Sequence, residues 1–307
     1  MNIKPYYELF EEIYERVNAD NEGNVAAYIP ELAKIDPEKF GVYISTVDCD
    51  KSSCIGFGDY QESFSIQSIV KVLSLVLAIK SGEKLWDRVG VEPSGSSFNS
   101  LVQLEFERGI PRNPFINAGA IVIADILLNT LTNPEQEFIQ FVRSLCGNQN
   151  INYDLTIAKS EKKHGYRNAA LVNMMKSYGN IRHNPEDTLD FYFKICSIKM
   201  TCEEIAKTFL FLANEGINPL NGQEIITKRQ NQRVNAVMQL CGFYNEAGEF
   251  AFRVGLPAKS GVGGGIIAIH PKQYSLAVWS PRLNEKGNSY RGFRFLEEFT
   301  TETSSIF

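Results

Sequence analysis

The chain has 307 residues, 44% hydrophobic and 22% charged, which is enough length and apolar content to bury the core of one large domain or of two lobes. Its formal net charge of −5 argues against a nucleic-acid-binding protein, which would carry a basic face. The best apolar run, INAGAIVIADILL, is interrupted by Asp125 and falls short of the ~20 residues that a membrane span needs, so we expect no membrane segment.

The first element expected is an amphipathic N-terminal helix. Apolar residues of MNIKPYYELFEEIYERV repeat at helical spacing, at Ile3, Tyr6, Tyr7, Phe10, Ile13 and Val17. Glutamates stand where an export signal would have its apolar core, so this segment is not a signal peptide. Two short β-prone runs follow, FGVYISTVD and SCIGFGD, and the polar CDKS between them predicts a hairpin.

A long helical middle is expected from Phe64 onward. NPEQEFIQFVRSLCG begins with the helix-start pair Asn133-Pro134 and has Gly147 after its last helical residue. NPEDTLDFYFKI repeats the Asn-Pro start at Asn184-Pro185. TCEEIAKTFLFLANEG opens with a capping box, in which Glu204 follows Thr201 at the required spacing, and is expected to close at its final glycine, Gly216.

Strand character returns near the C-terminus. AKSGVGGGIIAIH and YSLAVWSP read as strands joined by a turn at PKQ, and a last amphipathic helix follows around YRGFRFLEEF. Strands at both ends with helices between them predict an α/β (α+β) protein with one antiparallel sheet built from both termini, flanked by helices, and an inserted helical lobe. We expect one domain over residues 1–307, with a sheet lobe at about 1–63 and 225–307 and a helical lobe at about 64–224. A cleft between the lobes is the natural place for a site.

The cysteines indicate the compartment. Cys49, Cys54, Cys146, Cys196, Cys202 and Cys241 form no CxxC pair, and the three histidines (His164, His183 and His270) do not stand beside them at zinc spacing. Free thiols in a chain without an export signal fit a reducing cytosol, so we expect a cytoplasmic protein in which disulfides are the less favoured alternative. No metal and no cofactor is predicted.

The stretch FSIQSIVKV carries the first candidate for chemistry. Ser68 and Lys71 are three residues apart and would share one helix face, although a lysine there is more often a solvated tip. A serine hydroxyl needs a base to become a nucleophile, and a lysine serves only when it is neutral. A free lysine titrates at ~10.4, so burial or a neighbouring cation must lower the pKa. Lys259 could be that cation.

A second fragment, KSG at Lys259–Gly261, strengthens this hypothesis. A strand ending in Lys-Ser/Thr-Gly together with an SxxK helix is the arrangement of serine penicillin-recognising enzymes. The glycine run GVGGG leads into a strand, which argues against a phosphate loop. Its glycines would let backbone and substrate approach closely, with the Val262 N–H as an oxyanion donor; a bulge in a curved strand is the alternative.

Several motifs together resemble one family. They are YIPELAK, FSIQSIVKVLSLVLAI, EPSGSSFNS, NPFINAGAI, SE followed by RNAAL, YFKICSIKMTCEEIA and GLPAKSGVGGGI. This set is similar to the serine-dependent, β-lactamase-like glutaminases, over about Tyr28 to Asn288. The resemblance implies the penicillin-recognising α/β sandwich with a helical lobe, hydrolysis of L-glutamine to L-glutamate and ammonia, no cofactor, and a homodimer or homotetramer.

The resemblance also implies roles for individual residues. Ser68 matches the nucleophile that forms a glutamyl ester, Lys71 the lysine that activates it, and Tyr192 a tyrosine against the serine hydroxyl that shares proton transfer with Lys71. The N–H groups of Ser68 and Val262 would form the oxyanion hole. The residues matching those that bind substrate are Tyr28, Ser68, Asn117, Glu161, Asn168, Tyr192, Tyr244 and Val262, with Ser160, Lys259 and Ser260 in supporting positions.

Elementary chemistry supports this set, although alternatives stay open. Glutamine is a zwitterion, so its pocket needs an anion for the α-ammonium, such as Glu161, and Asn and Tyr donors for the α-carboxylate. Singly, Tyr28 could be a packing residue, Asn117 a helix cap and Glu161 a solvated charge. A penicillin-binding protein or β-lactamase is opposed by the missing export signal and by an unclear second motif. A non-catalytic amino-acid-binding module, or some activity on asparagine, also stays open, since one methylene is worth only ~1–3 kcal/mol.

Overall fold

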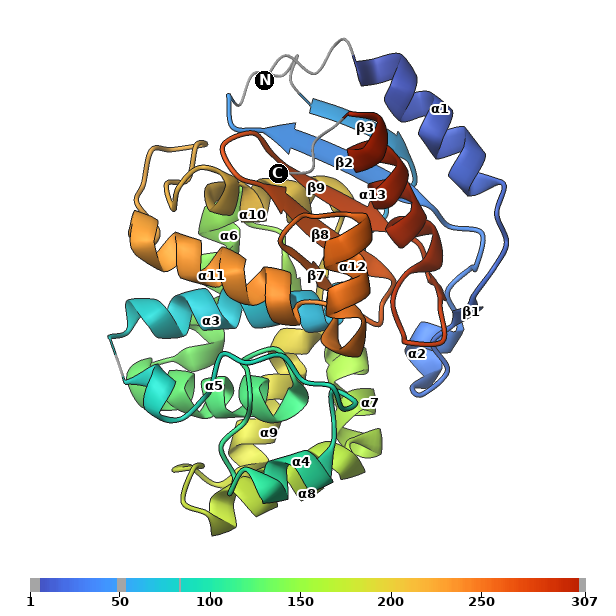
Figure 1. The fold of residues 1–307 in the computed structure, drawn as a ribbon. Coiled ribbons are helices and arrows are strands. Elements are labelled where there is room, and N and C mark those ends of the chain that lie inside the picture. Colours follow the sequence, from blue (N-terminus) through green and yellow to red (C-terminus); the bar gives the residue numbers. More distant parts are fainter. Residues whose placement is uncertain (1–5, 49–53, 83, 304–307) are drawn as a thin grey trace.

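The structure, a computed structural model, describes residues 6–48, 54–82 and 84–303. Figure 1 shows a twisted sheet with helices on both of its faces and a mainly helical part beside it. Among the described residues the largest sheet has five antiparallel strands in the order β3-β2-β9-β8-β7. They are β2 (Gly41–Thr46), β3 (Cys54–Gly58), β7 (Ala258–Ser260), β8 (Gly265–His270) and β9 (Tyr274–Trp279).

The sheet confirms that strands from both ends of the chain come together. β2 pairs with β3 as the predicted hairpin, from Gly41 opposite Gly58 to Ser45 opposite Cys54. The expected turn CDKS and Cys49 lie outside the described residues. β2 also pairs with β9, and β8 with β9, so the N-terminal hairpin is joined directly to the C-terminal strands.

Alternation along the strands separates two apolar layers, as side chains on a strand point to opposite faces in turn. Val42, Ile44 and Val278 face one layer, which is covered by α1 (Tyr7–Asn18), α12 (Ala247–Arg253) and α13 (Tyr290–Glu302). Phe10 of α1 lies there with its ring centroid 4.9 Å from that of Phe295. The predicted first helix is therefore confirmed from Tyr7, whereas Ile3 lies outside the described residues.

The opposite layer joins the sheet to the helices. Tyr43, Ile267 and Trp279 pack into a core that they share with the helical part. Its helices are α3 (Val70–Lys80), α4 (Leu101–Phe106), α5 (Asn117–Thr130), α6 (Pro134–Cys146), α7 (Leu155–His164), α8 (Tyr166–Ser177), α9 (Pro185–Cys196), α10 (Cys202–Ala213) and α11 (Lys228–Cys241). α10 lies within the range expected for the helical lobe, yet it packs against β2 and β9. We keep the division into a sheet lobe and a helical lobe as a proposal.

The predicted helix ends follow local chemistry. The Asn184 side chain accepts a hydrogen bond from the Glu186 N–H at 2.8 Å, and the Thr201–Glu204 capping box is formed. α6 starts at Pro134 and ends before Gly147, whose φ of +77° is the left-handed conformation that terminates helices. α10 ends at Ala213, short of the expected Gly216.

The chain enters the helical part differently from the expectation. Phe64–Ser65 is a short strand, β4, and the 3₁₀ turn η3 (Gln67–Ile69) precedes α3, so Ser68 stands before the α-helix and not inside it. β4 pairs with β6 (Ile198–Met200), which also pairs with β5 (Asn152–Tyr153). The smaller elements are β1 (Asn24–Val25), β10 (Arg282–Leu283), α2 (Pro30–Ala33), η4 (Leu85–Asp87) and η5 (Tyr244–Glu246).

Two further observations concern the whole described chain. None of its described helices combines the length and apolarity required to cross a bilayer. The cysteines at 54, 146, 196, 202 and 241 carry free thiols, and all but the first are buried.

Candidate active site

A cavity of about 290 Å³ opens where the sheet meets the helices. Eight of the residues expected to bind substrate line it together: Tyr28, Ser68, Asn117, Glu161, Asn168, Tyr192, Tyr244 and Val262. They come from segments far apart in the sequence, so the fold brings the whole expected set to one place. Four other expected site residues are buried and do not line the cavity: Lys71, Ser160, Lys259 and Ser260.

Ser68 is presented by a strained turn. Gln67, directly before it, has a φ of +47°, which is uncommon for a residue with a side chain. The glycine run packs against the same turn: a Cβ on Gly261 would lie 2.6 Å from the Ile66 carbonyl oxygen, and one on Gly263 would lie 2.3 Å from that of Ser65. Glycine is therefore required here for close approach, and the run brings Val262 beside Ser68.

Lys71 is a buried amine in the first turn of α3. Its side chain is 1% exposed, and Nζ donates to the Phe115 carbonyl oxygen at 3.0 Å and to Asn117 Oδ1 at 2.8 Å. Burial lowers the pKa of Lys71 to about 8, although Glu161 works in the opposite direction. The solvated-tip alternative is therefore wrong. Burial, and not the cation of Lys259, is what lowers this pKa.

Tyr244 lies between the two lysines. Its ring centroid is 4.0 Å from Nζ of Lys259 and 5.4 Å from Nζ of Lys71, and its hydroxyl hydrogen-bonds the Ser68 side chain. Nζ of Lys259 donates to the carbonyl oxygens of Gly242 at 2.8 Å and Ser260 at 2.6 Å. Burial and the neighbouring Lys71 lower the pKa of Lys259 far below its usual value.

Tyr192 has a different partner from the one expected. It is on α9, buried, and its hydroxyl hydrogen-bonds the thiol of Cys196 one turn later. Burial raises the pKa of Cys196 to about 12, so this thiol stays protonated. Tyr192 and Cys196 both line the cavity, whereas Tyr244 is the tyrosine that contacts the serine hydroxyl.

Glu161 supplies the negative charge of the cavity. The carboxylate is on α7, is 8% exposed, and accepts a hydrogen bond from the Tyr28 hydroxyl at 2.8 Å. Tyr28 is itself 48% exposed, but its hydroxyl points inward and also reaches Gln67 Oε1 at 3.2 Å. Burial raises the pKa of Glu161, and the hydrogen bonds from Tyr28 and Gln67 oppose the rise. The alternatives of a solvated Glu161 and a merely packing Tyr28 are wrong.

Asn117 and Asn168 connect two helices at the cavity. Asn117 is the first residue of α5, and its Nδ2 donates to Asn168 Oδ1 on α8 at 2.9 Å. Its own Oδ1 accepts from Lys71, so this amide connects the buried amine to α8. Asn117 is not the helix cap, because that position is Ile116.

Sequence reasoning missed part of the lining: Gln67, Phe98, Asn99, His164, Gly165, Arg167 and Cys196. Gln67 and Cys196 lie inside motifs already singled out, at one residue before Ser68 and one helical turn after Tyr192. Spacing could therefore have indicated these two. Of the supporting serines, Ser160 hydrogen-bonds Glu31, and Ser260 Oγ donates to the Gly242 carbonyl oxygen at 3.4 Å.

Comparison with known proteins gives a consistent result. The profile of the family described as Glutaminase matches residues 23–307. A glutaminase from Saccharophagus degradans is 54% identical over 310 aligned residues, covering 100% of both chains, and one from Christiangramia forsetii is 53% identical over 98% of this chain and 99% of its own.

Solved structures agree. The probable glutaminase ybaS superposes with a TM-score of 0.92 at 29% identity, covering 100% of this chain and 99% of its own. A probable glutaminase from Bacillus subtilis gives 0.87 at 31% identity, covering 100% and 98%. Mglu in its glutamate form gives 0.90 at 29% identity, covering 98% of this chain and 69% of its own.

Proposed function

The chain belongs to the glutaminase family, and from that membership we propose that it hydrolyses L-glutamine through a glutamyl ester on Ser68. It is an amidohydrolase with the β-lactamase-like fold of its structural relatives. The observation that carries the proposed mechanism is the buried Lys71 amine, with its pKa lowered to about 8, one turn beyond the serine that lines the cavity.

In the first half-reaction Ser68 Oγ attacks the carboxamide carbon of glutamine. The hydroxyl proton passes to neutral Lys71, with Tyr192 sharing the transfer, and the N–H groups of Ser68 and Val262 hold the oxyanion. The ammonium of Lys71 then gives its proton to the leaving nitrogen, so that the C–N bond breaks and ammonia departs. The hydrogen bond between Tyr244 and Ser68 supports a further role of that hydroxyl in orienting the nucleophile.

In the second half-reaction a water molecule attacks the glutamyl ester. Its proton passes to the same base, the C–O bond to Ser68 breaks, and the serine recovers a proton as L-glutamate leaves. The buried carboxylate of Glu161 fits the α-ammonium group of glutamine, which would replace part of the hydration that the carboxylate has lost. The side-chain amide of Asn168 is a donor available for the α-carboxylate, whereas the Tyr28 hydroxyl already donates to Glu161.

Ammonia release from L-glutamine by the purified protein tests this proposal. A folded Ser68→Ala variant is expected to release none, and rapid quenching of the wild type should trap protein heavier by one glutamyl group. L-Asparagine and a chromogenic lactam are run alongside. Acylation by the lactam without glutamine turnover, or turnover that survives Ser68→Ala, would overturn it.

Two further proposals concern the oligomeric state and the location of the protein. We propose a homodimer or homotetramer, as family resemblance implies, and a cytoplasmic location, which the free thiols among the described cysteines support. Light scattering coupled to gel filtration measures the first, and fractionation of expressing cells the second.

A further inference from the structure

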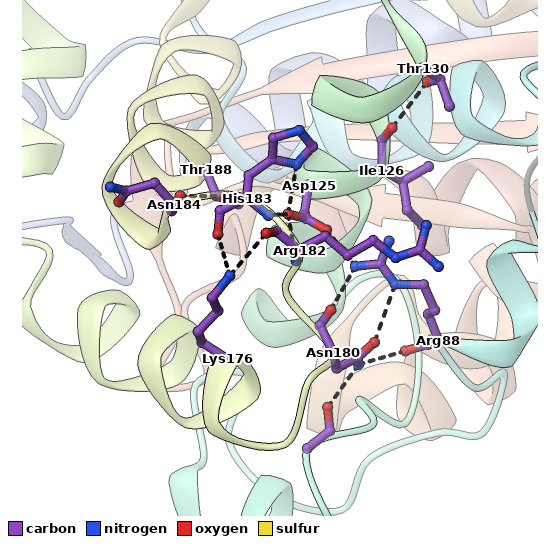
Figure 2. A network of polar contacts seen from close by, with 11 residues as sticks. Arg88, Asp125, Ile126, Thr130, Lys176, Asn180, Arg182, His183, Asn184 and Thr188 are labelled. Carbon is purple, nitrogen blue, oxygen red and sulfur yellow. Dashed lines mark hydrogen bonds and ion pairs between the residues drawn. The ribbon is translucent and has the colours of Figure 1, made fainter.

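A buried polar network joins α5 to the turn between α8 and α9 (Figure 2). At its centre is Asp125, the single charged residue of α5, which is 0% exposed. The carboxylate accepts hydrogen bonds from the backbone N–H of Arg182 at 3.1 Å and of His183 at 2.8 Å, and from His183 Nδ1 at 3.1 Å. Nη2 of Arg88, just after η4, donates to it at 2.5 Å. Asp125 therefore binds the backbone of a turn as well as a cation.

The side chains of Arg88 and Lys176 also bind this turn. The Arg88 guanidinium donates to Oδ1 of Asn180 at 3.3 Å and to its carbonyl oxygen at 2.6 Å, while Nδ2 of Asn180 returns a bond to the Arg88 carbonyl oxygen at 3.0 Å. Lys176 Nζ, near the end of α8, donates to the carbonyl oxygens of Arg182 at 2.9 Å and His183 at 3.0 Å. The turn from Asn180 to His183, which joins α8 to α9, is thus fixed to α5 and to the segment after η4 (Figure 2).

The distance from this network to the cavity is the same along three helices. Asn117 precedes Asp125 on α5, Asn168 precedes Lys176 on α8, and Tyr192 follows the Asn184 cap of α9, in each case by about 12 Å at 1.5 Å per residue. α5, α8 and α9 pack against one another. The Asn117–Asn168 hydrogen bond ties α5 to α8 at the cavity, and about 12 Å further along Asp125 ties α5 to the turn between α8 and α9.

We propose that Asp125 is a positioning residue, which fixes α8 and α9 along α5 and so places Asn168 and Tyr192 relative to Asn117. The inference rests on the proposed function, because it concerns the residues assigned to glutamine. A buried ion pair that served stability alone could be exchanged for apolar packing. Here the carboxylate holds the N–H groups of Arg182 and His183, which precede the N-cap residue Asn184, so it fixes the backbone that leads into α9.

Asp125→Asn is the informative substitution, because it keeps the shape and removes the charge. Its amide cannot accept on both sides, so the turn and Arg88 lose part of their anchor. We expect KM for glutamine to rise and kcat per folded molecule to fall, together lowering kcat/KM by about 10- to 100-fold, the loss that small misplacements in a site cause. Hydrogen exchange of α9 should become faster at the same time.

Asn218→Ala is the matched control. Asn218 is 1% exposed, donates to the Leu145 carbonyl oxygen at 3.2 Å and accepts from the Leu220 N–H at 3.0 Å, so it also fixes a turn to a helix. That helix, α6, carries no proposed site residue. Asn218→Ala should lower the melting temperature and leave KM, kcat per folded molecule and α9 exchange at their wild-type values.

A folded Asp125→Asn protein with wild-type KM and kcat overturns the proposal. If that variant does not fold, His183→Gln and Lys176→Met, which remove a partly exposed and an exposed member of the network, carry the test. Each is expected to raise KM about 2- to 10-fold, and wild-type kinetics in both would refute the positioning role. A wild type that releases no ammonia refutes the proposed function alone; unchanged α9 exchange in the folded Asp125→Asn protein refutes the positioning role in either case.

Discussion

Raising the pH from 7 to 10 should stabilise the wild type relative to a Lys71→Met variant by about 2.5 kcal/mol. The pKa of Lys71 is lowered from 10.5 to about 8 in the folded protein, and each unit is worth about 1.36 kcal/mol. Below pH 8 the amine is charged in both states, so the folded state bears the full cost of burying it. Between about 8 and 10.5 the unfolded chain binds more protons, so the free energy of unfolding rises with pH.

The difference between the two proteins is the quantity to measure. Buried thiols with raised pKa values that Lys71 does not influence, such as those of Cys146 and Cys202, make stability fall at high pH, but they are present in both proteins and cancel. Urea unfolding at pH 7, 8, 9 and 10 gives the difference at each pH. A flat difference across this range would refute the argument that Lys71 is buried with a depressed pKa.

The same titration should govern catalysis. At pH 7 roughly one Lys71 amine in ten is neutral, against roughly one in three thousand for a free lysine. The wild-type kcat/KM should therefore rise about tenfold per pH unit below 8 and level off above it. Lys71→Arg keeps a cation that does not lose its proton, and should be as inactive as Lys71→Met. An active arginine variant would exclude Lys71 as the base.

Three further predictions concern the cavity. Glu161→Gln should raise KM for glutamine by about 10- to 100-fold with a smaller effect on kcat, because a charge-assisted hydrogen bond is worth about 1.5–3 kcal/mol; steady-state kinetics measure it, and an unchanged KM would contradict the α-ammonium assignment. Gly263→Ala should lower both stability and kcat, since its Cβ would lie 2.3 Å from the Ser65 carbonyl oxygen, whereas Gly248→Ala, where nothing lies within 4 Å, should do neither; thermal unfolding and turnover of the pair decide. Tyr244→Phe should reduce kcat about tenfold by removing the hydrogen bond to the nucleophile, and full turnover in that variant would exclude the hydroxyl from the reaction.

Sequence patterns predicted the helix starts and strands that depend on residues close together in the chain. The Asn-Pro start at Asn184, the capping box at Thr201 and the apolar strand IIAIH each depend on neighbours within one turn or one strand, and each is found as expected. The placement of α10 on the sheet could not be predicted in this way. Its contacts are with strands more than about 50 residues away in the sequence, and amphipathic periodicity does not say which partner a helix will meet.

In the candidate site, too, some features could be predicted from the sequence and others could not. The residues carried by motifs meet in one cavity, because a motif records chemistry already assembled in relatives. The 3₁₀ turn at Ser68 was not expected, since Gln67 gives no sign in the sequence of its positive φ. Asp125 was noted only as an interruption of an apolar run; its partners are provided by two distant segments, and no spacing rule connects them.

Sequence reasoning and structure differ most in the physical cause that they give for the lowered pKa of Lys71. The sequence suggested that the cation of Lys259 lowers the pKa of Lys71. In the structure Lys259 is the more deeply buried of the two, at 0% exposure, and its pKa is lowered by burial and by the charge of Lys71. Burial lowers the pKa of Lys71 as well, and the neighbouring Glu161 raises it, so the lowered value does not depend on the charge of Lys259.

This difference in cause makes a distinct prediction for Lys259→Met. Because burial, and not the charge of Lys259, lowers the pKa of Lys71, the substitution should leave the rise of kcat/KM near pH 8, and it should lower the plateau by disturbing Tyr244, whose ring lies 4.0 Å from Nζ. The pH profile of the folded variant measures this. A rise displaced toward pH 10 would show that Lys259 keeps its charge and depresses the pKa of Lys71 after all, and would restore the like-charge explanation.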